Sequence, residues 1–146
     1  RRSARVVLLS PTGHVLLIRF SIKRADGLFI FWATPGGTVE AGETDAEAAA
    51  RELAEELRLN LALRGPIHTA TDRFEHHGSI VTNTDIFFAG YCDGEDIVLH
   101  GVSPEERTAM QVTRWWSADE IEESRETIFP PGLAELVRKQ SRIARS

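Results

Sequence analysis

Residues 44–59 constrain the fold most, because their pattern is the most clearly helical in the chain. Thr44 is followed three residues later by Glu47, which is the spacing of a capping box, and Asp45 suits the positive end of a helix dipole. Alanine and leucine fill the interior of the segment, in keeping with their high helix propensity. We therefore predict a helix over residues 44–59.

Short apolar runs on both sides of this helix predict strands. Residues 5–9 and 15–20 flank a turn that contains proline and glycine, which favours a β-hairpin. Residues 28–32 are rich in aromatic and branched side chains and predict a strand that ends at Pro35-Gly36-Gly37, since these residues cannot continue a regular ladder. Further strands are expected at residues 69–74, 80–92 and 111–116.

Two signals near the end of the chain predict helices. Ser117 and Glu120 repeat the capping-box spacing and indicate a short helix. Pro130-Pro131-Gly132 should break the chain before a final amphipathic helix that carries Leu133 and Val137. Strands and helices that alternate loosely, with hairpins between them, predict an α/β (α+β) fold with a mixed β-sheet between helices.

Length and composition indicate one globular domain over residues 1–146. Hydrophobic residues make up 42% of the chain and charged residues 27%, which excludes a disordered or fibrous class. The single cysteine, Cys92, cannot form an internal disulfide, so a cytoplasmic location is the default expectation. The chain starts without methionine, and we interpret this as a trimmed start and not as a signal peptide.

Charge and hydropathy narrow the class of partner. A net charge of −5 disfavours binding to duplex nucleic acid, and no apolar run approaches the roughly 18 residues of a membrane span. Small phosphorylated ligands stay compatible with this charge, because a bound cation can reverse the sign of an acidic site.

The predicted helix separates apolar and acidic side chains. At about 100° per residue, one arc should face the sheet; its members are Ala46, Ala49, Ala50, Leu53 and Leu57. Glu52, Glu55 and Glu56 form a second arc, where like charges destabilise a helix by a few tenths of a kcal/mol each. A hard divalent cation such as Mg²⁺ would offset this repulsion. The alternative is a solvated acidic face, which is the common role of a run of charges.

A glycine-rich segment leads into the N-terminus of this helix. Gly36, Gly37 and Gly42 lie within residues 36–43 and allow the backbone to approach a ligand closely. A helix N-terminus also presents unpaired N–H groups to anions. Loop, helix and carboxylates together could hold a metal-bound diphosphate, whereas the loop alone could be an ordinary connection with turn glycines.

The spacing of these residues resembles the signature of the Nudix (MutT-like) hydrolase family. Gly37 is followed after five residues by Glu43, and after seven more by the run Arg51-Glu52-Leu53-Ala54-Glu55-Glu56-Leu57-Arg58-Leu59. Every signature position matches except the last glycine, where this chain has Arg58. Weaker similarity extends from the hairpin around Gly13 to the segment 114–121.

The resemblance implies a Nudix-like α/β/α sandwich that hydrolyses a diphosphate bond in a nucleoside diphosphate linked to another moiety X. It implies Mg²⁺, or alternatively Mn²⁺, held by Glu52, Glu55 and Glu56. It further implies an Arg51–Glu43 pair that fixes the loop against the helix. Gly36 and Gly37 would pass close to the metal and the bound substrate.

Other roles implied by the resemblance are less defined. A late acidic residue should act as general base or extra ligand; Glu95, Glu105 and Glu106 are candidates and Glu106 is preferred, with a helical first turn as the alternative explanation for Glu105 and Glu106. Arg19 could contact a substrate phosphate or form a surface salt bridge. Arginine at position 58 disfavours a left-handed helix end, so the helix is expected to continue to Asn60.

The remaining conspicuous residues have ordinary explanations. His76-His77 is expected to be a loop pair, since no third metal ligand has suitable spacing. One of Trp115 and Trp116 should point into the core by strand alternation, and Cys92 should pack. A nucleotide-binding or interaction module that has lost catalysis stays the alternative function. The sequence leaves open the identity of X and the choice between monomer and homodimer.

Overall fold

The computed structural model describes residues 1–76, 78–100 and 110–145. Its elements, in chain order, are β1 (Arg2–Leu9), β2 (Val15–Arg24), β3 (Gly27–Ala33), β4 (Gly36–Thr38), α1 (Asp45–Leu57), β5 (Arg64–His76), β6 (Ser79–Tyr91), β7 (Met110–Trp116), α3 (Ala118–Glu123), β8 (Ile128–Phe129) and α4 (Leu133–Arg145).

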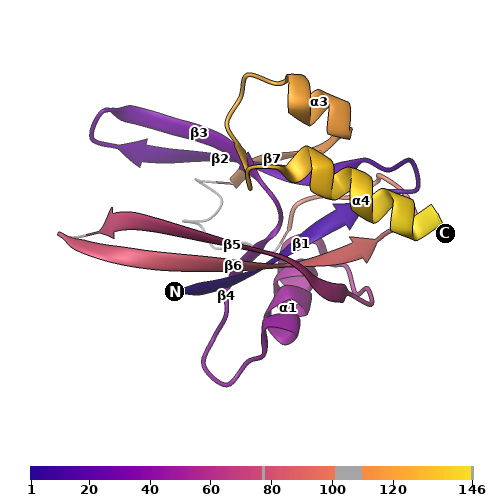
Figure 1. Ribbon diagram of the computed structural model, residues 1–146, viewed down its shortest axis with the longest axis horizontal. Coiled ribbons are helices and arrows are strands. Elements are labelled where there is room, and N and C mark those ends of the chain that lie inside the picture. The colour runs from indigo at the N-terminus through magenta and orange to yellow at the C-terminus, as the bar shows by residue number, and fades with distance from the viewer. Residues whose placement is uncertain (77, 101–109, 146) are drawn as a thin grey trace.

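One mixed sheet organises these elements, with α1 on one side and α4 on the other (Figure 1). The strand order is β5-β6-β1-β2-β3-β8, while β4 pairs with β1 and β7 pairs with β2. β1 runs parallel to β6 and β3 runs parallel to β8, whereas the other pairs are antiparallel. The predicted α+β class with a mixed sheet between helices is therefore confirmed.

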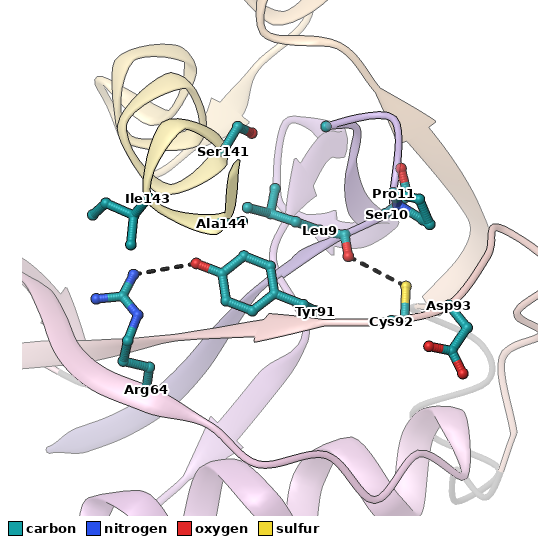
Figure 2. A pocket seen from close by; sticks show the side chains of 11 residues that line it. Leu9, Ser10, Pro11, Arg64, Tyr91, Cys92, Asp93, Ser141, Ile143 and Ala144 are labelled. Carbon is teal, nitrogen blue, oxygen red and sulfur yellow. Dashed lines mark hydrogen bonds between the residues drawn. The ribbon is translucent and has the colours of Figure 1, made fainter. Parts of the chain in front are cut away.

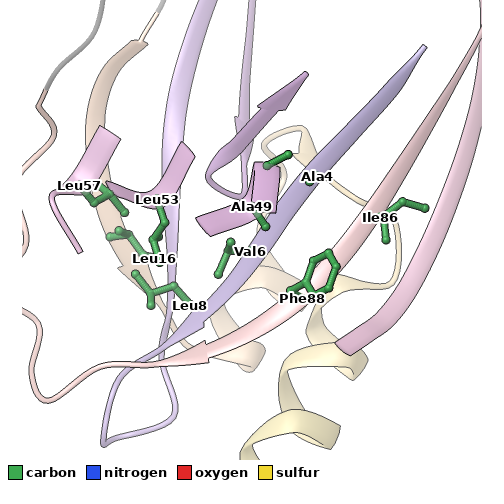
Figure 3. Close-up of a cluster of buried hydrophobic side chains, with 10 residues drawn as sticks. Ala4, Val6, Leu8, Leu16, Ala49, Leu53, Leu57, Ile86 and Phe88 are labelled. Carbon is green, nitrogen blue, oxygen red and sulfur yellow. The ribbon is translucent and has the colours of Figure 1, made fainter. Parts of the chain in front are cut away.

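β1 supplies side chains to the hydrophobic core on both faces of the sheet. Ala4, Val6 and Leu8 pack toward α1, where they meet Leu53 and its neighbours (Figure 3). The intervening residues of β1 point the other way, and Leu9 joins the cluster that includes residues of α4. This alternation places α1 firmly against the sheet beside β1 and β4.

The glycines after β3 form a strand, which corrects one expectation. β3 spans Gly27–Ala33, one residue longer at each end than the predicted strand over residues 28–32. Residues 36–38, however, form β4 and pair with β1 in the register Gly37↔Ala4 and Gly36↔Arg5. Gly36 has a φ of 148°, and a Cβ there would lie 2.3 Å from the main-chain oxygen of Ala4. Glycine therefore allows an unusually close ladder here, where the sequence pattern suggested only a break.

The end of α1 differs from the sequence-based prediction. The capping box of Thr44 and Glu47 forms as expected, but the helix ends at Leu57 and does not continue to Asn60. Arg58 itself takes the left-handed conformation (φ 55°, ψ 38°), and its N–H donates to the main-chain oxygen of Ala54. The cap hydrogen bond offsets part of the steric cost of a left-handed arginine.

The buried face of α1 is rotated from the predicted arc. Ala49, Leu53 and Leu57 are buried as expected, but Ala46 and Ala50 are exposed. Two other residues, Ala48 and Glu56, are buried in their place. The reason is β4, which packs on the side of α1 that carries part of the acidic arc. The acidic arc is thus partly enclosed and is not a wholly solvated face.

Candidate active site

Glu56 is a buried carboxylate held by the backbone of β4. Glu56 is 3% exposed, and its Oε1 accepts a hydrogen bond of 3.1 Å from the N–H of Gly36. An ionised carboxylate is costly to bury unless it is hydrogen-bonded or binds a cation. This position therefore aims a carboxylate at the junction of β4 and α1.

Glu52 lies directly against Gly37. A Cβ built on Gly37 would be 2.6 Å from Oε1 of Glu52 and 2.7 Å from its Cδ, so only glycine leaves room for this carboxylate. The Glu52 side chain is 16% exposed, whereas the Glu55 side chain is 54% exposed. The three carboxylates thus range from buried to open along one side of the helix.

Arg51 joins the loop, the strand β4 and the helix. It donates to both carboxylate oxygens of Glu43, at 2.7 and 3.0 Å, and to the main-chain oxygen of Thr38 at 3.0 Å. It also contacts Glu52 at 3.0 Å and Glu55 at 3.4 Å. A guanidinium suits this role because its donors form a rigid planar fork.

These contacts shift the pKa values of both partners. The hydrogen bond to Glu43 raises the pKa of Arg51, and the contact with Glu52 adds to the effect against desolvation. The hydrogen bond from Arg51 lowers the pKa of Glu43, helped by the N–H of Glu40. Both groups are therefore charged at neutral pH, and the expected Glu43–Arg51 pair is present.

The carboxylates near β4 offer the type of donor atom that a hard divalent cation prefers, although in this structure they are not drawn together around one point. Carboxylate oxygens are the ligands that Mg²⁺ and Mn²⁺ prefer. Over residues 1–76, 78–100 and 110–145, no three His, Cys, Asp or Glu side chains are gathered closely enough to hold a metal, and Arg51 is bonded to two of the three carboxylates. The fit rests on the glycine cradle around Glu52 and on the buried carboxylate of Glu56.

Of the three candidates for the late acidic residue, Glu95 is the one that the structure describes. The Glu95 carboxylate accepts hydrogen bonds from the hydroxyls of Ser10 and Thr12, both at 2.8 Å, so it lies at the β1–β2 turn. Glu105 and Glu106 lie outside the residues that the structure describes. The main-chain N–H of His100 donates to the main-chain oxygen of Glu56, which places the loop after β6 beside α1.

Arg19 lies in β2, in register with Trp32 of β3 and Val112 of β7. Its side chain is half-buried. The hydrogen bonds of Arg51 described above do not involve Arg19. The contact of Arg19 with a substrate phosphate therefore stays a prediction.

Three further residues behave as their sequence context suggested. Trp116 is buried and packs edge to face on Trp32, whereas Trp115 is partly buried and donates to the main-chain oxygen of Glu95. Burial raises the pKa of the Cys92 thiol, which donates to the main-chain oxygen of Leu9. Cys92 lines a cavity of about 680 Å³ near the C-terminal end of α4 (Figure 2). The side chains of His76 and His77 lie outside the part of the chain that the structure describes.

One set of hydrogen bonds beside β4, made by Arg5, was not predicted from the sequence. Arg5 donates to the main-chain oxygen of Thr34 at 3.1 Å and to the carboxylate of Asp85 at 3.3 Å. This contact arises because β1 lies between β4 and β6. No local sequence signal brings residues 5, 34 and 85 together.

Among the described helices, none is long and apolar enough to cross a membrane.

A family model for the NUDIX domain matches residues 1–140. The chain belongs to the Nudix family. A Bacillus subtilis (strain 168) protein, whose name assigns it 8-oxo-dGTP diphosphatase activity, is 39% identical over 66 residues. That alignment spans 45% of this chain and 40% of the relative, so the match covers less than half the length of either protein.

Solved structures show the same fold at low sequence identity. The E. coli dihydroneopterin triphosphate pyrophosphohydrolase has a TM-score of 0.69 and 22% identity, covering 94% of this chain and 92% of its own. The MutT protein of Methanosarcina mazei Go1 has a TM-score of 0.67 and 22% identity, covering 99% and 95%. The Nudix domain of Shewanella oneidensis NrtR, solved with ADP ribose, has a TM-score of 0.67 and 16% identity, covering 95% and 86%.

Proposed function

We propose that this Nudix chain hydrolyses the diphosphate bond of a nucleoside diphosphate linked to another moiety X, with Mg²⁺ or Mn²⁺ as cofactor. The observation that carries the proposal is the packing of β4 on α1, which buries Glu56 against the Gly36 N–H and leaves room for Glu52 only because residue 37 is glycine. The name of the Bacillus subtilis relative and the ADP ribose bound to the Shewanella oneidensis Nudix domain support a small nucleotide derivative as the substrate.

In this proposal, Glu52, Glu55 and Glu56 hold the cation. When bound, the cation neutralises charge on the diphosphate and lowers the pKa of a coordinated water. Arg51, anchored by Glu43, keeps the helix and the loop in register so that the carboxylates stay oriented. Such positioning matters because phosphoryl transfer depends chiefly on geometry and electrostatics.

The proton acceptor for the attacking water is assigned to Glu106, as the family resemblance suggests. Its segment follows the loop that contacts Glu56 through His100. We also propose that Gly36 and Gly37 lie beside the bound substrate and that Arg19 contacts one of its phosphates.

The test is hydrolysis of a panel of nucleotide derivatives with and without Mg²⁺, comparing the wild type with Glu56→Gln. The amide of glutamine can still accept the Gly36 hydrogen bond, so folding should persist, whereas a neutral amide is a poor ligand for a hard cation. We expect metal-dependent turnover in the wild type and a loss of at least about 10²-fold in the variant. Glu123→Gln removes an exposed charge on α3 and serves as the control. Equal turnover by wild type and Glu56→Gln would refute the assignment of Glu56.

A further inference from the structure

The hairpin of β2 and β3 leaves one side of β3 largely unpaired. β3 pairs with β2 along its whole length, from Gly27 to Ala33, and the hairpin extends away from the helices (Figure 1). On the other side of β3, the only pairing within the described part of the chain is with β8, and this pairing begins at Trp32. Residues 27–31 therefore form an open edge of the sheet.

The backbone groups that face this edge belong to Leu28 and Ile30. The N–H of Trp32 donates to the main-chain oxygen of Thr127 at 2.9 Å, so the backbone groups of Trp32 face the β8 side of the strand. Successive residues of a strand direct their N–H and C=O groups to opposite sides. Those of Leu28 and Ile30 therefore also face outward, whereas the residues between them bond to β2. The open edge thus presents two donors and two acceptors.

The side chains along this edge are apolar on both faces of the strand. Leu28 is 65% exposed and Ile30 is 38% exposed. On the opposite face, the rings of Phe29 and Phe31 stack with their centroids 5.1 Å apart. Residues 27–31 include neither a charged residue nor a proline. An exposed apolar edge of this kind is a template for pairing with another strand.

The outer edge of β5, at the other end of the sheet, shows the contrast. β5 contains Pro66 and the charged residues Asp72, Arg73 and Glu75. Proline and charged side chains are common means by which an edge strand avoids pairing with another chain. One edge of the sheet is therefore protected by its sequence, and the β3 edge is not.

We propose that the β3 edge pairs with β3 of a second copy of this chain, in an antiparallel dimer whose twofold axis passes beside Phe29. In this register, Leu28 of each copy lies opposite Ile30 of the other, and each such pair exchanges two backbone hydrogen bonds. All four outward-facing groups of each copy are then bonded. A twofold dimer needs a surface that is complementary to itself, and this edge meets that requirement. The inference does not depend on the proposed hydrolysis.

The length of the open edge matches the strand that would occupy it. β8 covers the edge from Trp32 onward, where residue 26 of the second copy would otherwise lie. The second copy's β3 begins at Gly27, because the chain before it turns back toward β2. Gly27 would lie opposite Phe31 of the other copy, and a Cβ at Gly27 meets nothing within 4 Å, which leaves room for the ring. This match favours a second copy over an unrelated strand.

The first test is sedimentation equilibrium over a dilution series of the wild type, Ile30→Pro and Ile30→Val. We expect the wild type to change from one chain to two as its concentration rises. Proline at residue 30 removes an outward N–H and none of the bonds to β2, and proline is tolerated on edge strands. Valine also shortens the side chain but keeps the N–H. The dimer Kd of Ile30→Pro should therefore exceed that of Ile30→Val by at least about 30-fold, since two hydrogen bonds are lost per dimer.

Hydrogen exchange of the wild type locates the interface. When about nine chains in ten are paired, the N–H groups of Leu28 and Ile30 are open to water for about a tenth of the time. Their exchange should therefore be about tenfold slower than in a dilute sample of single chains. The N–H groups of Phe29 and Phe31 bond to β2 in either state and provide the internal reference.

Four results would each overturn the inference. They are a wild type that is still a single chain at about 1 mM, equal Kd values for folded Ile30→Pro and Ile30→Val, a dimer in which the Leu28 and Ile30 amides exchange as fast as in single chains, and slow exchange of these amides at every concentration. The last result would place another segment of the same chain on the edge. Circular dichroism verifies that both variants are folded, and the exchange measurement needs no variant.

Discussion

Substituting Gly37 by alanine should separate activity from stability. The backbone of Gly37 is not in the left-handed region, so alanine is compatible with it, and the nearest obstacle is the carboxylate of Glu52. Because that carboxylate ends a flexible side chain, it can move away at small cost. The Gly→Ala change also reduces the entropy of the unfolded chain, which contributes about 0.4–1 kcal/mol in favour of folding.

The size of the effect follows from the distances. A Cβ at residue 37 would lie 2.6 Å from Oε1 of Glu52, whereas ordinary contacts begin at 3.4 Å, so the carboxylate must move by about 0.8 Å. A misplacement of about 1 Å at a reacting centre costs about 10²-fold in rate, or about 2.7 kcal/mol of barrier. We therefore expect a fall in kcat of about 10²-fold with Tm nearly unchanged.

The assay is Mg²⁺-dependent product formation together with thermal unfolding of the same samples. Gly94→Ala is the matched control, since a Cβ at Gly94 meets nothing within 4 Å and its φ is not left-handed. Gly36→Ala is the opposite case: its Cβ would meet backbone atoms of Ala4 and Arg5 at 2.3 and 2.8 Å, and it should destabilise the fold itself. Full activity in folded Gly37→Ala would refute the claim that the position of Glu52 matters.

Three other substitutions test the supports of the site. Arg58→Gly should stabilise the folded state by about 1 kcal/mol and raise Tm by about 3 °C, because glycine adopts the left-handed conformation without the steric cost of arginine. Turnover should not change, since residue 58 follows the three carboxylates in the chain. An unchanged or lower Tm in calorimetry would contradict this prediction. Arg51→Lys should lower kcat about tenfold, because lysine cannot bond both oxygens of Glu43 as a planar fork, and a rate equal to the wild type would show that the fork is dispensable. Hydrogen bonds, the one from the Ser10 hydroxyl above all, lower the pKa of Glu95 below its usual 4.5 in the folded state. The ionised carboxylate therefore stabilises the folded state at pH values above the unfolded pKa. This stabilisation is lost as the pH falls through the lowered folded-state pKa. Glu95→Gln should therefore be less stable than the wild type in urea at pH 7, and this difference in unfolding free energy should shrink as the pH falls below 4.5. A difference that stays constant with pH would exclude the linkage.

The sequence predicted the elements that carry strong local signals. The capping boxes at Thr44 and Ser117 both form, and the predicted hairpin forms between β1 and β2. These features depend on a few neighbouring residues, which is why pattern alone identifies them. The pairing of Glu43 with Arg51 was available only from the family resemblance, because it joins a loop to a helix.

Long-range contacts account for what the sequence did not show. The strand β4 exists because β1 offers a partner more than thirty residues away, so the glycines after Pro35 indicated only a break. The same contact rotates the buried face of α1 and encloses Glu56, which helical periodicity had placed on an acidic surface. A cavity of about 380 Å³ that Phe31 and Asn83 line likewise exists only because β1, β3, β5 and β6 meet in space.

The parallel pairing of β1 with β6 has a consequence for how the chain acquires its structure. Arg2 pairs with Thr84 and Leu9 with Tyr91, so one strand is separated from its partner by about eighty residues. Closing so long a loop is entropically costly before any ladder bond forms, and folds that depend on such contacts form slowly. During synthesis, the apolar residues Val6–Leu9 emerge long before β6 exists to cover their edge. We expect the native state to assemble only after Tyr91 has left the ribosome, and chaperones that shield an apolar strand to raise the folded yield.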